Sequence, residues 1–453
     1  MSMASENLQS KIENKTARVA VIGLGYVGLP LALEFARTGF TVIGVDIDAR
    51  KVNALRAGTS YIQDVPSADV ARLGQEKKFS ATENFDALRD ADVMFICVPT
   101  PFDRMKAPDL SAVIAATESI APHLRAGQLI ILQSTTFPGT TEEVCLPILE
   151  KSGLRAGKEF HLAFSPERID PGATSSAGWS VKNTPKVLGG LTPRCTELAK
   201  ALLIHLTPQV HIVSSPRVAE MTKLLENIFR AVNIALVNEL ALLMERMHID
   251  IWEVIDAAKT KPYGFMPFYP GAGVGGHCIP VDPYYLSWKA REHDFVTRFI
   301  ELAAEINEGM PYHLVKLVSD ALNRAGKAVQ KSRVLIVGVA FKRDVDDARN
   351  SPAERVIELL LARGATVDYH DPYVPQFAVG ANVFQRARTL FESRALTAEN
   401  LRAMDVVVIV TGHRAVDYQL IVENARLIVD AVNATAELTP ADARRIVRVG
   451  APM

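Results

Sequence analysis

The sequence predicts an α/β protein in which two doubly wound parallel-sheet domains are joined by a long central helix. Short apolar runs alternate with helical patterns near both ends of the chain, and this alternation is typical of parallel sheets covered by helices. Between them, residues 216–247 form one uninterrupted helical pattern. We therefore expect a first sheet domain over 1–215, a central helical connector over 216–325 and a second sheet domain over 326–453.

Composition and charge limit the class of protein. The 453 residues are 48% hydrophobic and 22% charged, with a net charge of −1, which does not favour nucleic acid or an anionic membrane surface as a partner. Residues 1–17 are polar and lack the apolar core of a signal peptide. No apolar run approaches the ~20 residues of a membrane helix. We therefore expect a cytoplasmic protein.

The first domain opens with a strand, a glycine-rich turn, a helix and a second strand. The strands cover 18–22 and 40–45, and the helix covers 26–38. The turn 23–28 has the pattern G-x-G-x-x-G, and Asp46 follows the second strand. This order is that of a Rossmann-like dinucleotide-binding unit.

The residues of that turn have defined roles in such a unit. Gly23 allows the tight turn, Gly25 lets the backbone approach a pyrophosphate, and Gly28 lets the helix pack on the strand. The N-terminus of the helix offers N–H groups to the phosphates. Asp46 can accept hydrogen bonds from both ribose hydroxyls and would repel a 2′-phosphate, so the sequence favours NAD over NADP.

Further strand patterns, at 92–98 and 128–133, continue this sheet. The first ends in the loop 99–101 and the second in the loop 134–139, and the run 160–168 likewise ends in polar residues. In open parallel sheets, ligands bind beyond the carboxyl ends of the strands. We therefore expect these loops to contact the cofactor or the substrate.

The helical pattern from Pro216 to Met247 carries two polar residues one turn apart. Lys223 and Asn227 share a face that is otherwise poor in charge. They could be groups that hold a ligand, or a lysine whose stem lies on apolar surface beside a solvent-facing amide. The length of the helix suggests a connector between domains and a dimer seam. Its apolar residues recur at helical spacing: Leu224, Leu225, Ile228, Val232, Leu236, Leu240 and Leu243.

The segment 271–285 is rich in glycine and contains one of the four cysteines. Cys278 follows the glycines, and Asp282 lies four residues later. A thiol on such a turn with a carboxylate nearby is typical of a placed nucleophile, and a buried free cysteine beside a tight loop is the alternative. The remaining cysteines are too far apart for a paired metal site and indicate a reducing compartment: Cys97, Cys145 and Cys195.

The second sheet domain weakly repeats the first. It has a strand pattern at 333–338, a helix at 351–363 and strand patterns at 365–370 and 405–410. The G-x-G-x-x-G pattern is missing from it. Its first loop suits the phosphate groups of another ligand, with a solvated run of charge as the alternative, because it carries Lys342, Arg343 and Arg349.

Six motifs carry a family resemblance that extends over almost the whole chain. They are Gly23-Leu-Gly25-Tyr26-Val27-Gly28-Leu-Pro30, Ser134-Thr135, Ser165-Pro-Glu167-Arg168, Ala219-Glu-Met-Thr-Lys223-Leu-Leu-Glu-Asn227, Gly275-Gly-His-Cys278 and Ala340-Phe-Lys342. In this order they resemble the NAD-dependent nucleotide-sugar 6-dehydrogenases, which include UDP-glucose and GDP-mannose dehydrogenases. Residues 165–172 and 275–283 look like the branch that acts on UDP-N-acetylhexosamines, nearest to UDP-N-acetyl-D-glucosamine 6-dehydrogenases of bacterial O-antigen and capsule pathways.

The resemblance implies a two-step, four-electron oxidation of the C6 alcohol of the sugar. Cys278 would form a thiohemiacetal with the intermediate aldehyde, and a second oxidation would give a thioester that water hydrolyses to the uronic acid. Lys223 and Asn227 would stabilise the developing alkoxide. The residues that would hold or activate water and assist proton transfer are Thr135, Glu167 and Asp282.

The resemblance also assigns binding residues and implies no metal. The expected NAD contacts are Gly23, Gly25, Tyr26, Val27, Gly28, Asp46, Lys51, Thr100, Thr135 and Arg349. The expected contacts to the UDP-sugar are Glu167, Arg168, Lys223, Asn227, Tyr269, Gly271, Gly275 and Lys342, with Lys342 on the diphosphate. A homodimer or a dimer-based oligomer is expected.

The chain departs from the family pattern at four positions, which are Ala272, Val281, Asn350 and Val432. Val281 stands where UDP-glucose dehydrogenases often have lysine, which argues against glucose as the sugar. Val432 stands where many relatives have arginine, which leaves the affinity for the diphosphate open. The sequence leaves three alternatives: UDP-N-acetylmannosamine, UDP-N-acetylgalactosamine or UDP-glucose as substrate. A catalytically silent dimer that binds NAD and a sugar nucleotide is a fourth.

Overall fold

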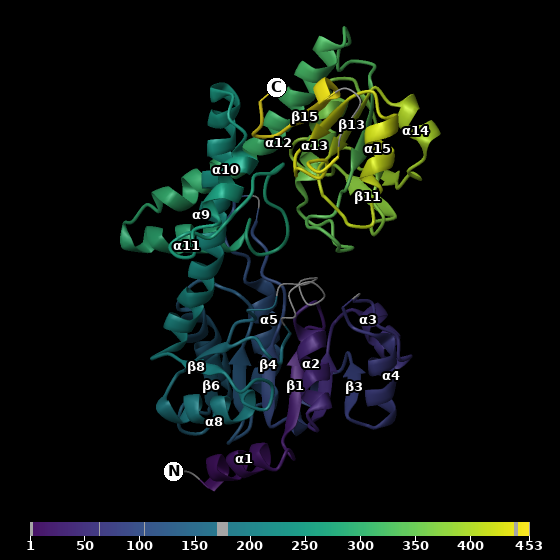
Figure 1. Ribbon diagram of the computed structural model, residues 1–453. Coiled ribbons are helices and arrows are strands. Elements are labelled where there is room, and N and C mark those ends of the chain that lie inside the picture. Colours follow the sequence, from purple (N-terminus) through teal and green to yellow (C-terminus); the bar gives the residue numbers. More distant parts are fainter. Residues whose placement is uncertain (1–2, 63, 104, 170–179, 439–442, 453) are drawn as a thin grey trace. The chain divides into compact units, whose positions relative to one another are not determined.

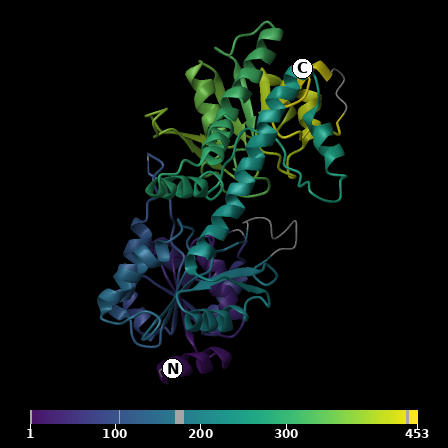
Figure 2. The same ribbon diagram turned by 90° about the vertical axis from the view of Figure 1, so that its left-hand side faces the viewer.

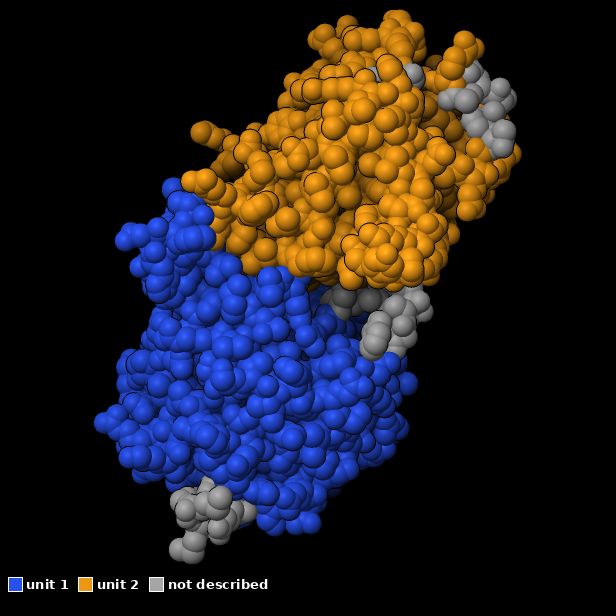
Figure 3. All heavy atoms as spheres, turned by 60° about the vertical axis from the view of Figure 1, so that its left-hand side comes forward, with its two compact units in different colours: residues 1–226, 284–296 blue, residues 227–283, 297–453 orange. Residues whose placement is uncertain are grey.

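The computed structural model describes residues 3–62, 64–103, 105–169, 180–438 and 443–452. The chain forms two compact units, one of residues 1–226 with 284–296 and the other of residues 227–283 with 297–453 (Figure 3). Each unit contains a wholly or mainly parallel sheet with helices on both faces. The predicted fold class is therefore confirmed.

The first unit is built on an eight-stranded sheet in the order β3-β2-β1-β4-β5-β6-β7-β8 (Figure 1). Strands β1 to β6 are parallel, and their order is that of dinucleotide-binding sheets. Strand β7 reverses direction against β6, and β8 is parallel to β7. The strands are β1 Arg18–Ile22, β2 Thr41–Val45, β3 Phe79–Thr82, β4 Val93–Ile96, β5 Leu129–Leu132, β6 His161–Phe164, β7 Lys186–Gly190 and β8 Val210–Ile212.

Alternate residues of the central strands enter two different hydrophobic cores. Val19 and Val21 of β1 lie in the core that includes α2 and α8, whereas Ala20 and Ile22 lie in the core that includes α5. This alternation buries both faces of the sheet. The helices of this unit are α1 Met3–Glu13, α2 Gly28–Arg37, α3 Ala49–Arg56, α4 Ser67–Gln75, α5 Ser111–Ile120, α6 Leu146–Leu149 and α8 Pro193–Leu203.

The second unit contains a five-stranded parallel sheet in the order β10-β9-β13-β14-β15 and a small antiparallel pair, β11 with β12. The strands are β9 Arg333–Val337, β10 Thr366–His370, β11 Gln376–Val379, β12 Thr389–Glu392, β13 Val406–Ile409, β14 Ile428–Asp430 and β15 Ile446–Arg448. The helices are α10 Ile251–Ala258, α12 Arg298–Arg324, α13 Pro352–Ala362, α14 Ala398–Ala403 and α15 Tyr418–Asn424.

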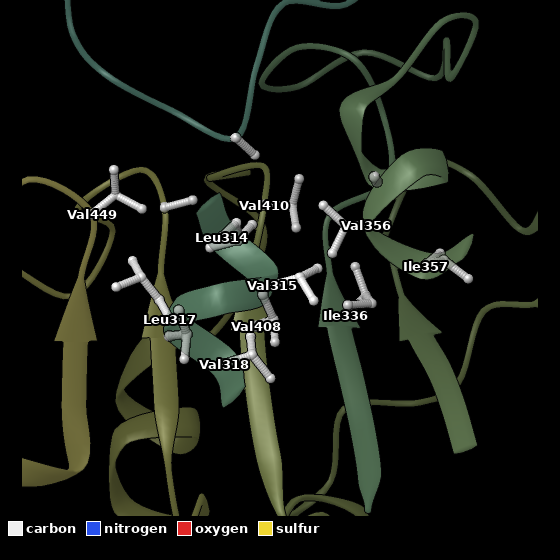
Figure 4. Close-up of a cluster of buried hydrophobic side chains, with 14 of the residues drawn as sticks. Leu314, Val315, Leu317, Val318, Ile336, Val356, Ile357, Val408, Val410 and Val449 are labelled. Atoms are coloured by element: carbon white, nitrogen blue, oxygen red, sulfur yellow. The ribbon is translucent and has the colours of Figure 1, made fainter. Parts of the chain in front are cut away.

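The core of the second unit is formed where α12 and α13 cover one face of this sheet. Figure 4 shows Val315 and Val318 of α12 beside Ile336 of β9 and Val408 of β13. The opposite face packs against α14 and α15, and it receives Leu335 and the other alternate strand residues. The second sheet is thus doubly wound like the first.

Helices α9 Pro216–Met247 and α11 Asp282–Ala290 each contribute residues to both units. Helix α9 begins and ends at the predicted residues and is one continuous helix (Figure 2). The expected apolar stripe is only partly buried, because Leu225 and Leu236 are 58% and 50% exposed whereas Leu224 is fully buried. Lys223 and Asn227 are buried as well, so the alternative of a solvent-facing amide is wrong.

Among the described residues, α9 is also the one helix whose length and composition would let it cross a membrane. By length and composition alone, α9 therefore departs from the expectation that no segment is apolar enough to span a membrane. A third of its most apolar window is buried inside the structure. Since α9 also buries Glu220 and Asn238 against hydrogen-bond partners of the protein, we regard it as a core helix.

Candidate active site

The glycine-rich turn after β1 has the backbone geometry that the sequence predicts. Gly23 has φ +90°, and a Cβ at this position would lie 2.6 Å from the carbonyl oxygen of Cys97. A Cβ at Gly28 would lie 1.8 Å from the carbonyl oxygen of Gly23. At Gly25 a Cβ would meet nothing within 4 Å, so the backbone is open there to a ligand. No side chain caps α2, but the Leu29 N–H already donates to the Gly25 carbonyl at 3.1 Å, so only part of the first turn is open to phosphate oxygens.

Asp46 follows β2 and is buried at this turn. Its Oδ2 accepts hydrogen bonds from the Leu24 N–H at 2.8 Å and from Lys51 Nζ at 3.2 Å, and its Oδ1 accepts from the Asp48 N–H at 2.9 Å. A carboxylate has about four acceptor positions, so one remains for a ribose hydroxyl, which is fewer than the two hydroxyls expected from the sequence. The residues present therefore fit NAD. Tyr26 and Val27, which lie in the same turn, are half-buried.

The loops after β4 and β5 are held to each other. Ser134 Oγ donates to the carbonyl of Val98 at 2.7 Å, and Tyr285 of α11 donates to the carbonyls of Thr100 and Pro101. Thr135 follows directly and is half-buried. The structure thus places Thr100 and Thr135 at the carboxyl edge of the sheet, where ligands of open parallel sheets bind.

Glu167 lies just beyond β6 and is surrounded by donors. Its Oε2 accepts from Lys186 Nζ at 2.9 Å and from Gln133 Nε2 at 3.1 Å, and its Oε1 accepts from the Ile169 N–H at 3.2 Å. The neighbouring Arg168 donates through Nε to Glu226 of α9 at 2.7 Å. The sequence did not indicate Lys186 or Gln133, because each is a single polar residue at the end of an apolar strand.

The buried face of α9 carries three polar groups, which follow one another at intervals of about one helical turn. Glu220 accepts from the N–H groups of Gly139 at 2.6 Å and Thr141 at 2.9 Å. Lys223 is buried one turn later. Asn227 Nδ2 donates to Asp282 Oδ2 at 2.5 Å, and these two side chains are only 4% and 3% exposed. The structure therefore brings together two predicted catalytic residues that are far apart in sequence.

Cys278 is the exposed cysteine, whereas Cys97, Cys145 and Cys195 are buried. The Asp282 N–H donates to the Cys278 carbonyl at 2.7 Å, so the thiol residue lies one turn before the start of α11. Burial raises the pKa of the Cys145 thiol to about 12, and it also raises the pKa of Cys97. The alternative of a buried cysteine at position 278 is wrong, and the buried thiols are poor nucleophiles at neutral pH.

Residues 271–281, which precede α11, form the cysteine loop, and its N-terminal end is held by α9 and α10. The Gly271 N–H donates to Asn238 Oδ1 at 3.0 Å, and Asn238 in turn donates to Asn307 Oδ1 at 2.9 Å. Tyr269 stacks on Trp252 of α10, with ring centroids 5.8 Å apart. Ala272, where relatives often have proline, is buried in the core of this unit.

The middle of the cysteine loop contacts the loop between β9 and α13. Asn350 Nδ2 donates to the Gly276 carbonyl at 3.0 Å, and His277 Nε2 lies 2.6 Å from Asp347 Oδ2. Burial and the charge of Arg349 lower the pKa of His277, which favours its neutral form. Asn350 has φ +52°, a conformation that asparagine tolerates well. This departure from the family pattern therefore supports the cysteine loop.

The same loop carries the predicted phosphate and cofactor contacts of the second unit. Lys342 is half-buried just after β9. Arg349 donates to Asp347 through Nε at 3.0 Å and Nη2 at 2.7 Å, so its guanidinium is held by a carboxylate of its own loop. Val432 lies 3.3 Å from the position of a Cβ on Gly412 and is partly buried. Within the described residues, no group of three His, Cys, Asp or Glu could hold a metal.

Three family models match the chain in order. They are the NAD binding domain, the central domain and the UDP binding domain of the UDP-glucose/GDP-mannose dehydrogenase family, at residues 17–207, 217–309 and 335–437. The matched regions follow the two sheets and the helical segment between them.

Characterised relatives and solved structures agree with these matches. A UDP-N-acetyl-D-glucosamine 6-dehydrogenase of Pseudomonas aeruginosa is 42% identical over 80% of this chain and 84% of its own. A UDP-N-acetyl-D-mannosamine dehydrogenase of Pyrococcus horikoshii is 35% identical over 93% of this chain and 96% of its own.

The solved structure of a UDP-D-ManNAc dehydrogenase from Pyrococcus horikoshii is 31% identical, with a TM-score of 0.85 over 96% of this chain and 99% of that chain. The chain thus belongs to the UDP-glucose/GDP-mannose dehydrogenase family, and it is an NAD-dependent oxidoreductase of nucleotide sugars.

Proposed function

We propose that this protein oxidises the C6 alcohol of UDP-N-acetyl-D-glucosamine to the uronic acid. The observation that carries the proposal is the exposed thiol of Cys278, one turn before the helix whose Asp282 is hydrogen-bonded to Asn227. The 42% identity to a UDP-N-acetyl-D-glucosamine 6-dehydrogenase supports the choice of sugar. The product would serve O-antigen or capsule synthesis in the cytoplasm.

The residues of this chain have different roles in the proposed reaction. NAD, when bound, supplies a hydride acceptor. Lys223 and Asn227 would stabilise negative charge on the C6 oxygen while that carbon is oxidised to the aldehyde. The sulfur of Cys278 would then bond to the aldehyde carbon, and oxidation of the thiohemiacetal would leave a thioester. Water would add to its carbonyl carbon, the carbon–sulfur bond would break, and the carboxylate would leave.

Proton transfer in this sequence needs groups near the reacting carbon. We assign it to Asp282, Glu167 and Thr135, which would hold the water or accept its proton. In this proposal residues 1–215 bind NAD and residues 326–453 bind the UDP group. Lys342 would contact the diphosphate, and Lys51 would help Asp46 to hold the ribose.

The stoichiometry of the reaction tests this proposal. Wild-type protein should produce two NADH for each UDP-N-acetyl-D-glucosamine consumed. Cys278→Ala should still bind NAD and the sugar nucleotide, because the glycine-rich turn and Lys342 are unchanged, but it should form no acid. Cys145→Ala, which removes a buried thiol, serves as the control and should retain most of the activity. A ratio of one NADH in the wild type would overturn the covalent mechanism.

The second candidate is the same reaction on UDP-N-acetyl-D-mannosamine. The names of several relatives favour it, including those of Pyrococcus horikoshii and Yersinia pestis. UDP-N-acetylgalactosamine and UDP-glucose are further substrates to compare. Measurement of kcat/KM for all four sugar nucleotides decides between them, and the absence of oxidation with each would indicate a binding protein without catalytic activity.

A further inference from the structure

Lys186 is a buried lysine to which the proposed reaction gives no role. It is only 1% exposed, although lysine is rarely buried without a partner. Its Nζ lies 2.9 Å from Glu167 Oε2. A cation thus lies next to a carboxylate that we assign to proton transfer.

The reversal of the sheet at β7 explains how Lys186 reaches Glu167. Strand β6 is parallel to β5 and antiparallel to β7. The end of β6 therefore lies beside the end of β5 on one side and the start of β7 on the other. Gln133 follows β5 and Lys186 is the first residue of β7, so both point donors at Glu167. A parallel β7 would bring its last residue to this edge instead.

We propose that Lys186 is a positioning residue that keeps Glu167 ionised and correctly oriented for hydrolysis of the thioester. This inference rests on the proposed function. In that step the water oxygen bonds to the thioester carbon and a water proton passes to Glu167. The carbon–sulfur bond then breaks, with its electron pair on the sulfur of Cys278. Only an ionised carboxylate can take the proton, and burial beside no cation would favour the protonated form.

The other charged and titratable groups around Glu167 do not replace Lys186. The Cys97 thiol, just after β4, stays protonated because burial raises its pKa. Arg168 is engaged by Glu226 and by the Pro185 carbonyl at 3.2 Å. Among the described residues, Lys186 is the cation that hydrogen-bonds to Glu167.

The test compares Lys186→Met and Lys186→Arg in the full-length protein with saturating NAD and UDP-N-acetyl-D-glucosamine. Lys186→Met should slow hydrolysis about a hundred-fold at pH 7, which is the lower end of the range of general-base contributions. The acid limb of the pH–rate profile should move to higher pH. Intact mass spectrometry should show the acyl group on Cys278 accumulating after a burst of two NADH per site. Lys186→Arg keeps the charge and should keep the limb near its wild-type position.

Two further variants separate this role from a loss of folding. Lys289 is another buried lysine, held by Glu143 at 2.7 Å and Glu292 at 2.6 Å. Lys289→Met should reduce stability without moving the acid limb. Lys186→Met combined with Glu167→Gln removes both charges of the buried pair, so it should fold as well as Glu167→Gln alone, even if Lys186→Met does not.

Two outcomes would overturn the inference. One is an unchanged acid limb and hydrolysis rate in folded Lys186→Met. The other is unfolding of the double variant, which would mean that Lys186 supports the fold independently of Glu167. In both cases wild-type protein still yields two NADH per sugar, so the proposed function stands. If the wild type yields one or none, the proposed function itself has failed.

Discussion

Asp46 and Asp371 occupy equivalent positions in the two sheets but have different partners. Each follows the second strand of its unit, and each accepts a hydrogen bond from the turn after the first strand. Oδ2 of Asp371 accepts from two backbone N–H groups, those of Val339 and Ala340, and lies 3.0 Å from His413 Nε2. The acceptor positions of Asp371 are therefore taken by groups of its own unit, whereas Asp46 retains one acceptor position for a ribose hydroxyl.

This difference gives a prediction at Asp46. Wild-type protein should use NAD far better than NADP, because a 2′-phosphate would lie about 4 Å from the carboxylate at a cost of several kcal/mol at intermediate dielectric. Asp46→Asn should lower kcat/KM for NAD about tenfold, and it should reduce the preference over NADP. The ratio of kcat/KM for the two cofactors measures the effect. Equal use of both by the wild type would contradict the assignment.

His161 gives a prediction about acid stability. Burial, together with the charge of Arg194, lowers the pKa of this β6 histidine to about 4 from an ordinary 6.5. Between pH 6.5 and pH 4 the unfolded chain binds more protons at this site than the folded chain. Stability is thus fully present above pH 6.5, and it is lost as the pH falls toward 4.

The loss due to His161 should be about 2 kcal/mol at pH 5. His161→Gln removes the titrating group, so the drop in unfolding free energy between pH 7 and pH 5 should be smaller by about this amount. Urea denaturation of both proteins at both pH values measures it. An identical drop in the two proteins would show that His161 does not titrate in this range.

Individual elements were the most predictable part of the chain. The ends of α9 and the position of β1 match the sequence pattern, because helical and strand periodicity is a local property. The buried face of α9 was not predictable from that pattern. Its polar residues are buried because distant groups satisfy them, as Asp282 does for Asn227 and Gly139 does for Glu220. Such pairings depend on tertiary contacts that no single segment contains.

The cysteine loop gives a prediction at the scale of an element. A Cβ at Gly275 would lie 2.8 Å from the Asn350 carbonyl oxygen and 2.9 Å from Phe341 Cβ and Pro352 Cδ. Gly275→Ala should therefore displace the loop, with a cost of about 1–3 kcal/mol in stability and a fall in kcat of at least about tenfold. Steady-state kinetics and the alkylation rate of Cys278 measure the displacement.

Gly309→Ala is the matched control for that substitution. Gly309 lies within α12, and a Cβ there would meet nothing within 4 Å. The change should raise the unfolding free energy by about 0.5–1 kcal/mol and leave the activity unchanged. If Gly275→Ala behaved in the same way, the contacts of the cysteine loop with the β9–α13 loop would have no role in positioning the thiol.

At the scale of the whole molecule, the compact units do not follow the chain. Residues 284–296 belong to the first unit, although in sequence they lie between two segments of the second unit, residues 227–283 and 297–453. The contacts responsible include those of Tyr285 with the Pro101 carbonyl and of Lys289 with Glu143. The sequence predicts three successive regions because periodicity cannot show that a later segment returns to an earlier sheet.

The exposed face of α9 supports the expected dimer. Large apolar side chains recur along it at intervals of four or seven residues, and each is 45–58% exposed: Leu225, Phe229, Leu236, Leu243 and Met247. Such spacing is typical of a helix that pairs with another helix. We propose that two copies associate through this face, as a closed pair with twofold symmetry.

Light scattering after size-exclusion chromatography tests the association. The wild type should have about twice the chain mass of 49.5 kDa. Leu236→Glu places a charge in the centre of the apolar face and should shift the protein toward the monomer. Leu390→Glu is the control, since this β12 residue is 58% exposed and lies elsewhere on the surface. A monomeric wild type, or equal masses for all three proteins, would exclude this interface.

Because Cys278 is the exposed one of the four cysteines, its reaction with a thiol reagent can measure the number of competent active sites. A chromogenic disulfide reagent should react quickly with one thiol per native chain, at Cys278, and with all four only after unfolding. The fast amplitude of a preparation would therefore equal its concentration of intact nucleophiles. Mild peroxide should reduce that amplitude and the activity in parallel, and a reductant should restore both as long as oxidation stops at the sulfenic acid or a disulfide.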